Sequence, residues 1–429
     1  MTRSIHLNSR LLPFLIGLLI LLQLIQPYRG WMILLFGLGG AWITSYLWAR
    51  SLLKNLHLMR EMRFGWAQVG DQLEERFTIE NNGPVPALWV EIIDHSTIPD
   101  HHINWATGVE AKAITQWHTQ GICSQRGVFI LGPTSLKSGD PFGFFTVLVH
   151  DPRSQSVMVM PPVVPLPRIE VAVGGRSGEG FPRPNASERT VSSGSVREYI
   201  PGDSMRWIHW KTTAHHNHPF VRVFDGTPAG DWHIFLDLDQ QVQLGVGSDS
   251  TVEHSIILAA SLAARGLDRR RAVGLAVNGK NVVWIPPRAG EGQRWDILRS
   301  LALVDTGHQP MSEFLHCMEH DIRSQTSIVL ITPSLQSDGV EALLPLIRRG
   351  VTPTILLLDQ ESFGGQLSSL PMQDVLTDLG VAHYIITKEL LNTPAAHPGQ
   401  KGHWEWRVTP SGRAVLVRKP GDMSWKALS

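Results

Sequence analysis

The sequence has little cysteine and no net charge, and each shortage excludes a class of protein. Its 429 residues include two cysteines, Cys123 and Cys317, far apart in the chain. Two distant cysteines supply neither a disulfide framework nor a cysteine-based zinc site, and they suit a reducing compartment. Lysine plus arginine equals aspartate plus glutamate, with 38 of each. Any site for a polyanion must therefore be local, because the chain as a whole is not basic.

Residues 1–63 combine an apolar stretch with basic flanks. Between Leu11 and Ala49 the one charged residue is Arg29, which lies in an expected turn. Two apolar helices, at about residues 11–25 and 31–48, approach the ~20 residues that a membrane span needs. A cleaved signal peptide is the alternative, although no small-residue cleavage site follows. The basic flanks predict a transmembrane helical hairpin with both ends, and the soluble domains, in the cytoplasm.

The rest of the chain divides into five further segments. Short alternating apolar stretches at residues 64–160 predict an antiparallel β-sandwich. Proline, glycine and serine fill residues 161–195, which we interpret as a connector. Residues 196–230 are rich in charged and aromatic side chains. Strands and helices alternate over residues 231–390, which predicts an α/β domain with a mostly parallel sheet covered on both faces. Residues 391–429 are expected to form a tail with one hairpin.

Two details of the β region can be checked directly. The apolar alternation at Leu73, Phe77 and Ile79 is followed by a turn, and a return strand is expected at residues 88–92. Residues 126–145, RGVFILGPTSLKSGDPFGFF, predict two strands and a turn at residues 140–143. Asp140 is expected to accept hydrogen bonds from the amides of that turn.

The segment at residues 196–230 predicts a turn, a short helix, a loop and a strand. Pro201 and Gly202 form the turn, and Asp203 or Ser204 can cap a helix whose early positions include Ile208. A strand is expected at residues 220–224.

Four functions compete for this segment. Its arginines and tryptophans can bind phosphate or nucleic acid by charge and stacking, through Arg197, Arg206, Lys211, Arg222, Trp207 and Trp210. Imidazole suits zinc or copper, and the histidines are His209, His215, His216 and His218. Acid–base catalysis would use Glu198, Asp203 and a histidine, but no oxyanion hole or clear nucleophile accompanies them. The favoured hypothesis is a structural clamp or a protein-docking surface. Arginine forms ion pairs with carboxylates, tryptophan stacks and makes cation–π contacts, and both residue types dominate interfaces.

Together, RGVFILGPTSLKSGDPFGFF and REYIPGDSMRWIHWKTTA resemble the two hallmark blocks of the bacterial family catalogued as domain of unknown function 58. The resemblance extends to a membrane hairpin, a β domain and a domain similar to von Willebrand factor type A. It implies membrane-linked assembly work beside a MoxR-type AAA+ ATPase, with no settled catalytic activity. The signature and docking positions that it marks are Arg197, Glu198, Tyr199, Pro201, Gly202, Asp203, Arg206, Trp210, Lys211, Arg126, Gly127, Asp140, Pro141, Phe142 and Gly143.

The type A resemblance also implies a metal-site pattern, Asp-x-Ser-x-Ser, which this sequence replaces with Asp237-Leu238-Asp239-Gln240-Gln241. Carboxyl ends of parallel strands share one edge, so Asp237, Asp239, Thr332, Ser334 and Asp359 are expected along a common rim. Asp237 and Asp239 are weak candidates for a divalent cation, and no other cofactor is predicted.

We therefore expect a membrane-anchored cytosolic scaffold or adaptor without enzymatic activity, which partners a protein such as a MoxR-type AAA+ ATPase and does not bind nucleic acid. The alternative is a metal-dependent hydrolase that uses the degenerate rim or the histidine cluster.

Overall fold

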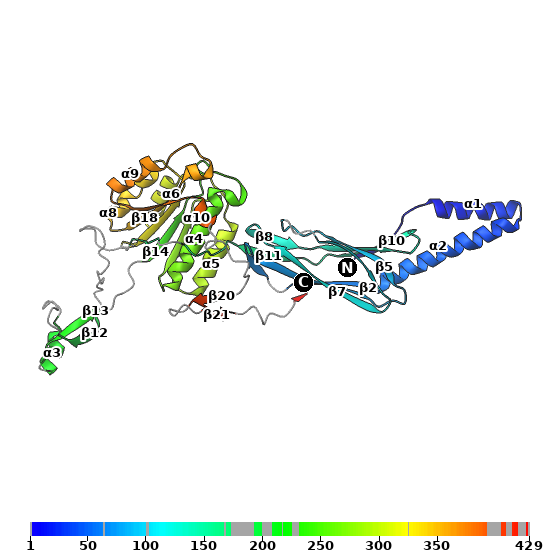
Figure 1. Ribbon diagram of the computed structural model, residues 1–429, viewed down its shortest axis with the longest axis horizontal. Coiled ribbons are helices and arrows are strands. Elements are labelled where there is room, and N and C mark those ends of the chain that lie inside the picture. The colour runs from blue at the N-terminus through cyan, green and yellow to red at the C-terminus, as the bar shows by residue number, and fades with distance from the viewer. Residues whose placement is uncertain are drawn as a thin grey trace. The chain divides into compact units, whose positions relative to one another are not determined.

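The chain folds into two compact units, one formed by Met1–Pro162 with Pro398–Ser429 and the other by Val163–His397. The computed structural model describes residues 2–62, 65–99, 103–166, 169–172, 193–199, 208–216, 218–224, 231–324 and 326–392, with strands at 405–408, 414–418 and 426–427. Each unit is described by itself below, and Figure 1 gives the element labels used for both.

Unit 1 begins with a strand and two apolar helices. Strand β1 (Thr2–Leu7) is followed by α1 (Leu11–Ile25) and α2 (Arg29–Asn55). Helix α2 is long and apolar enough to cross a membrane, whereas the 15-residue α1 is shorter than a usual span. The two helices run beside each other in opposite directions (Figure 1).

The remaining strands of unit 1 form three sheets. A five-stranded sheet has the order β1-β10-β9-β5-β6, a four-stranded sheet β22-β2-β4-β7 and a three-stranded sheet β3-β11-β8. The strand bounds are β2 Leu56–Met62, β3 Trp66–Gln68, β4 Gln72–Asn81, β5 Ala87–Asp94, β6 Asn104–Val109, β7 Ala113–Ile122, β8 Gly127–Leu131, β9 Thr134–Gly139, β10 Phe145–Asp151, β11 Gln155–Met160 and β22 Lys426–Ala427. Strands β20 (Glu405–Val408) and β21 (Ala414–Arg418) pair with each other.

The two larger sheets share one apolar core. Alternate residues of β2 and β4, including Leu58 and Phe77, are buried against alternate residues of β5 and β10, including Ile92 and Val147. Period-two alternation produces this pattern because successive strand side chains point to opposite faces. The last turns of α2 enter the same core through Ala49 and Leu52.

The structure corrects the expected return strand in this region. Strand β4 pairs with β2 and β7, while β5, which follows it, pairs with β6 and β9 in the other sheet. The chain therefore crosses between sheets at residues 82–86 instead of folding back as a hairpin. Asn81 helps to fix this crossing, since its side-chain amide donates to the carbonyl oxygens of Val85 and Glu110 at 2.9 and 3.1 Å.

Unit 2 contains a six-stranded sheet with the order β16-β15-β14-β17-β18-β19, parallel except for the edge strand β16. Numbered along the chain this is the order 3-2-1-4-5-6 of doubly wound α/β folds. The mixed α/β architecture expected from the sequence is confirmed. The strands are β14 Trp232–Leu236, β15 Val273–Val277, β16 Val283–Arg288, β17 Ser327–Thr332, β18 Thr352–Leu358 and β19 Ala382–Ile386.

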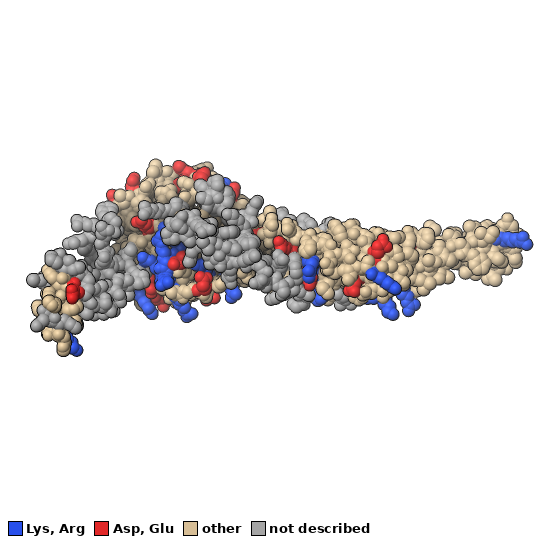
Figure 2. All heavy atoms as spheres, turned by 60° about the horizontal axis from the view of Figure 1, so that its bottom comes forward, with Lys and Arg blue, Asp and Glu red and all other residues tan. Residues whose placement is uncertain are grey.

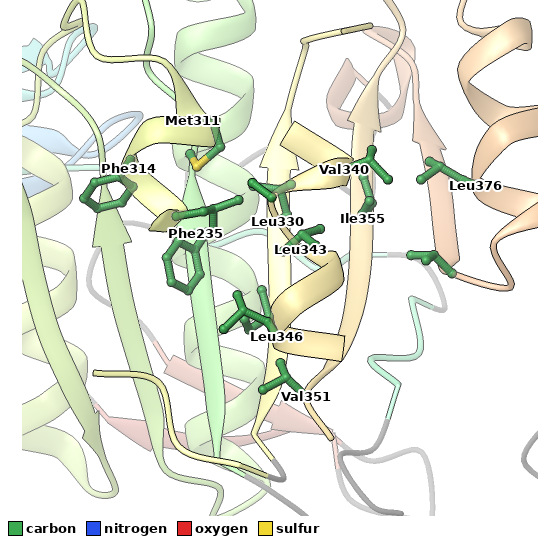
Figure 3. Close-up of a cluster of buried hydrophobic side chains, with 14 of the residues drawn as sticks. Phe235, Met311, Phe314, Leu330, Val340, Leu343, Leu346, Val351, Ile355 and Leu376 are labelled. Atoms are coloured by element: carbon green, nitrogen blue, oxygen red, sulfur yellow. The ribbon is translucent and has the colours of Figure 1, made fainter. Parts of the chain in front are cut away.

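Helices cover both faces of this sheet. On one face, α6 and α9 contribute Phe314 and Leu376 to a core that includes Phe235, Leu330 and Ile355 (Figure 3). Helices α4 and α5 pack on the other side of the sheet and against each other. The helices are α4 Thr251–Asp268, α5 Glu291–Leu303, α6 Met311–Met318, α7 Asp338–Glu341, α8 Leu344–Arg348, α9 Leu370–Asp378 and α10 Glu389–Asn392, with 3-10 turns at Gly247–Asp249 and Gln360–Phe363.

A buried arginine joins the two large sheets of unit 1. The Arg60 guanidinium, on β2, donates to both carboxylate oxygens of Glu75 on β4, at 2.8 and 3.0 Å. It also reaches Asp94 on β5 at 2.6 Å and the Thr134 hydroxyl on β9 at 3.1 Å. The Arg60, Glu75 and Asp94 side chains are 2%, 0% and 2% exposed. Removal of the arginine would leave two carboxylates buried without their shared cation.

We predict that Arg60→Met destabilises unit 1 by about 3–5 kcal/mol, because breaking a buried ion pair strands the partner charges. Hydrogen exchange of peptides from β5 and β9 in the full-length protein measures the local loss. Arg76→Met is the control, since Arg76 pairs with Glu61 between the same two strands at a site where the side chains are 26% and 13% exposed, and a pair that water reaches contributes less than a fully buried one. Equal losses in the two variants would contradict the role of Arg60.

Candidate functional site

One cleft of unit 2 lies at the carboxyl ends of β14 and β17. Its lining includes Asp237, Asp239, Thr332 and Ser334. These strands are neighbours in the sheet, and the chain leaves them in opposite directions along the strand order. This is the switch point at which doubly wound sheets hold ligands. Four of the five residues expected on a common rim therefore line one cleft.

Asp359 is the exception, because it is not among the residues that line the cleft. It follows β18, one strand further from the switch point, and its carboxylate accepts from the Ser369 hydroxyl at 2.9 Å. Because β18 runs parallel to its neighbour β17, Asp359 lies at the same edge of the sheet, as expected, without lining the cleft.

Asp237 is the central group of the cleft, and its carboxylate is engaged on both oxygens. Oδ2 accepts from the Thr332 hydroxyl at 2.6 Å, and Oδ1 accepts from the Asn278 amide at 2.9 Å and from the Asp239 backbone amide at 3.1 Å. The residue is 1% exposed. Burial raises the pKa of this carboxyl above its ordinary value of 3.8, and the three hydrogen bonds oppose that rise only in part.

Asn278 is a residue of this site that sequence reasoning missed. It follows β15 directly, is fully buried, and its side chain bridges Asp237 to the Leu238 amide and the Gln309 carbonyl, at 2.6 and 2.9 Å. The sequence did contain a signal for this residue, because Asn278 is a polar residue directly after the buried strand β15, and β15 pairs with β14 in the sheet. The rule that selected Thr332 would have selected it too.

Asp239, the second weak metal candidate, organises its own turn. Its Oδ1 accepts from the Gln241 amide at 3.2 Å, and the residue bridges to Gly307. Within the described residues, no group of three histidine, cysteine or acidic side chains is placed to hold a metal ion. Hydrogen bonds from Thr332, Asn278 and the Asp239 amide use three of the roughly four lone-pair positions of the Asp237 carboxylate.

The segment expected to carry the docking function is described in part. Strand β12 (Ser193–Glu198) pairs with β13 (Phe220–Phe224), which places Arg197 opposite Val221 and Glu198 opposite Phe220. The Tyr199 amide donates to the Pro219 carbonyl at 2.8 Å. The predicted strand at residues 220–224 is present. Pro201, Gly202, Asp203 and Arg206 lie outside the described residues.

The described helix of this segment begins at Trp210, and the expected helix start at residues 203–207 lies outside the described residues. Ile208 forms an antiparallel bridge with Val221, so it is extended, and α3 (Trp210–His216) begins two residues further on. His209 caps this helix, because its Nδ1 lies 2.7 Å from the Thr212 hydroxyl and accepts from the Thr212 amide at 3.3 Å. One nitrogen of the expected histidine cluster therefore has a structural partner.

Two side chains at the start of α3 face solvent. Trp210 is 71% exposed and Lys211 is also exposed. A large aromatic side chain that the fold leaves outside is typical of an interface. This exposure favours the docking hypothesis for Trp210 over the clamp hypothesis, which needs the ring to be buried.

Residues 195–362 match the model of a family described as protein of unknown function DUF58. The chain resembles the DUF58 family. The family predicted from the sequence is thus confirmed over a region that runs from β12 to the turn after β18. A curated relative is the uncharacterized protein YeaD of Bacillus subtilis, 22% identical over 262 residues, or 59% of this chain. The chain spans 63% of the length of that relative.

Similar solved structures include the SpRpn10 VWA domain, with 14% identity and a TM-score of 0.28 over 40% of this chain and 97% of that chain. Another is an aerotolerance-related membrane protein from Bacteroides fragilis, with 15% identity and a TM-score of 0.29 over 39% of this chain and 94% of that chain. The fold of unit 2 is assigned from its strand order, because TM-scores of this size do not establish a shared fold.

The first signature block of this DUF58-like chain, residues 126–145, lies in unit 1. Arg126 precedes β8, and Gly127 begins it. Asp140 accepts from the amides of Phe142 and Phe145, at 2.9 and 2.6 Å, which is the structural role that the sequence predicted. Gly143 has a φ of +73°, a conformation that favours glycine.

We predict that Asp237→Asn stabilises β14 relative to the wild type as the pH rises above 3.8. The raised pKa means that the folded state holds this proton more tightly than the unfolded state does, so ionisation costs stability as the pH increases. Asparagine keeps the shape and has no proton to lose. Hydrogen exchange of a β14 peptide, corrected for intrinsic rate, measures the difference between the two proteins at each pH.

The comparison at equal pH also removes the effect of His233 on stability, which has the opposite pH dependence. Burial lowers the pKa of His233 to about 4. That histidine makes β14 less stable as the pH falls from 6.5 toward 4, in the wild type and the variant alike. A pH-independent difference between Asp237→Asn and wild type would show that the Asp237 carboxyl is not perturbed.

Proposed function

We propose that this protein is a membrane-anchored scaffold whose DUF58 signature segment docks a protein partner. The observation that carries the proposal is the exposure of Trp210, 71%, at the first position of α3. Tryptophan is enriched among the residues that dominate binding energy, and its burial by a partner removes a large apolar area from water. Lys211 beside it adds a charge that can orient the partner.

The switch-point cleft supports a scaffold rather than a hydrolase. A catalytic carboxylate or a metal ligand needs a lone pair directed at the substrate or the ion. Most of the acceptor capacity of Asp237 is used inside the protein, by Thr332, Asn278 and the Asp239 amide, which favours a structural role for this carboxylate. The apolar floor of the same cleft, which includes Val340 and Ile355, suits contact with a peptide side chain.

The membrane part of the proposal depends on α2 and on how it is attached. Arg3, on β1, donates to the carbonyl oxygens of Leu53 and Lys54 at the end of α2, at 2.7 Å each. The chain segments that enter α1 and leave α2 are thus tied together, which supports a hairpin with both ends on one side of the membrane. Arg10, Arg50 and Lys54 are exposed at that side and favour the cytoplasm.

Arg60 follows α2 in the basic flank, but it adds no exposed charge there. Its guanidinium is buried between the sheets and neutralised by Glu75 and Asp94. Exposed basic residues alone therefore favour the cytoplasmic orientation.

A MoxR-type AAA+ ATPase is the partner that the family resemblance implies. We predict that Trp210→Ala lowers recovery of such an ATPase with the detergent-solubilised full-length protein by tenfold or more, the effect of losing about 2 kcal/mol at a hot spot. Arg206→Ala is expected to act in the same direction. Val246→Ala is the control, because Val246 is 90% exposed in the same unit and lies outside the signature segment.

Mass spectrometry of the co-purified proteins gives the readout, and circular dichroism checks the fold. Unchanged recovery of every partner from the folded Trp210→Ala protein would refute docking through this residue.

We further predict that the purified full-length protein contains no zinc, magnesium or manganese whose amount depends on Asp237 or His209. Elemental analysis of the wild type, Asp237→Ala and His209→Ala makes the test. One equivalent of metal per chain that either substitution removes would favour the metal-dependent hydrolase and contradict the scaffold.

A further inference from the structure

Within unit 1, both apolar helices extend from the β strands beside the turn at residues 140–143. Asn8, just before α1, donates its backbone amide to the Phe144 carbonyl at 2.9 Å and its side-chain amide to the Gly143 carbonyl at 2.8 Å. On α2, the Trp42 and Tyr46 rings lie 6.1 and 5.7 Å from the ring of Phe145. The turn is therefore fixed at the base of the helical pair.

The parts of the two helices that extend beyond the β strands are short for a bilayer. Helix α2 has 27 residues, but from Trp42 onward it packs on the β strands, where Ser45, Ala49 and Leu52 are buried. Residues 29–41 extend beyond that contact over about 20 Å, and the 15 residues of α1 cover about 22 Å. The hydrocarbon core of a bilayer is about 30 Å thick.

The surface of this helical pair is apolar on the side that faces away from the β strands. Phe14, Leu24, Ile33 and Phe36 are each more than 70% exposed. Figure 2 shows the same region as almost entirely uncharged, with a basic group at its far tip. An exposed apolar surface of this extent marks a contact with lipid or protein.

The turn adds an aromatic group to this apolar surface. Phe142 is 58% exposed and its ring stacks on Phe144, with centroids 5.9 Å apart and planes inclined by 15°. The buried Asp140 carboxylate holds the backbone of the turn through the amides of Phe142 and Phe145. The exposed ring is thus presented by a preorganised turn, which lowers the entropy cost of any contact it makes.

We infer that the 140–143 turn enters the lipid headgroup region beside the helices, with Phe142 as an interfacial anchor. This inference rests on the membrane anchoring in the proposed function. A lipid surface is the occupant because the turn is continuous with the apolar helices, and because entry of this end of unit 1 covers the missing 8–10 Å, roughly, of hydrophobic length. The exposed Arg10 at the same base can meet lipid phosphate groups.

The inference gives a function to a block that otherwise reads as a tight turn. The Asp140 hydrogen bonds and the positive φ of Gly143 explain the geometry of the turn. They do not explain a phenylalanine at the exposed position 142, where a polar residue would satisfy the same geometry.

The test places a fluorescent label on the turn of the full-length protein in phosphatidylcholine–phosphatidylglycerol vesicles. The background is Cys317→Ser, and Cys123 stays unlabelled because it is buried and its thiol pKa is raised to about 11. Phe142→Cys carries the label, and Pro141→Cys is a second site that keeps the Phe142 ring. Val128→Cys is the control, since Val128 is 47% exposed on β8, at the opposite end of unit 1.

Vesicle flotation is measured first, and then quenching of the label by nitroxide-bearing lipids. We expect the protein to float, labels at 141 and 142 to lose most of their emission, and the label at 128 to keep it. Floating protein with unquenched labels at both turn positions overturns the inference and leaves the anchoring intact. Protein that does not float overturns the anchoring and the inference together. A turn label that is shielded from water but not quenched by lipid indicates a protein contact, which also refutes a lipid occupant.

Discussion

The architecture of unit 1 depends on one guanidinium buried between two sheets. Arg60 directs its N–H groups at Glu75, Asp94, Thr134 and Ser96, which come from strands of both sheets or from the chain just after them. An isolated buried charge would be costly, but two carboxylates and two hydroxyls satisfy this one. Because the carboxylates lie on different sheets, the same bonds fix how the sheets face each other. The core that they enclose continues into Ala49 and Leu52 of α2, so the apolar helix is mounted on a rigid base.

Local patterns in the sequence predicted which elements exist, and distant pairings decided how they assemble. Apolar stretches gave the bounds of α1 and, to within two residues, the start of α2, which continues to Asn55 beyond the expected end at residue 48. Alternation gave most strands. Strand β1 was missed because Thr2–Leu7 becomes a strand only by pairing with β10, more than a hundred residues later. The same holds for β22 of the tail, which pairs with β2. Alternation around residues 73–92 gave both strands correctly, but it carries no information on which sheet each strand joins.

In unit 2 the location of the candidate site was predictable from the sequence, because the order and direction of the strands determine which residues share an edge. Parallel strands bring their carboxyl ends to one edge, so Asp237 and Thr332 could be placed together from the sequence. The roles of these side chains could not be predicted from the sequence. They depend on the hydrogen bond from Asn278 and on the burial of Asp237, and both follow from the packing of the folded chain. Ile208 illustrates a second limit. Its neighbours favoured a helix, yet its β-branched side chain fits beside β13, and tertiary pairing overrode the local signal.

The two signature blocks lie in different units, and this separation has a functional consequence. The 140–143 turn is held by Asp140 within unit 1, next to the apolar helices, whereas Trp210 begins α3 in unit 2. The Asp140 carboxylate accepts from the amides of Phe142 and Phe145, so residues of the turn itself hold its backbone. Because each block has its own local support, the lipid contact inferred for the turn and the partner docking proposed for Trp210 can be tested by separate substitutions.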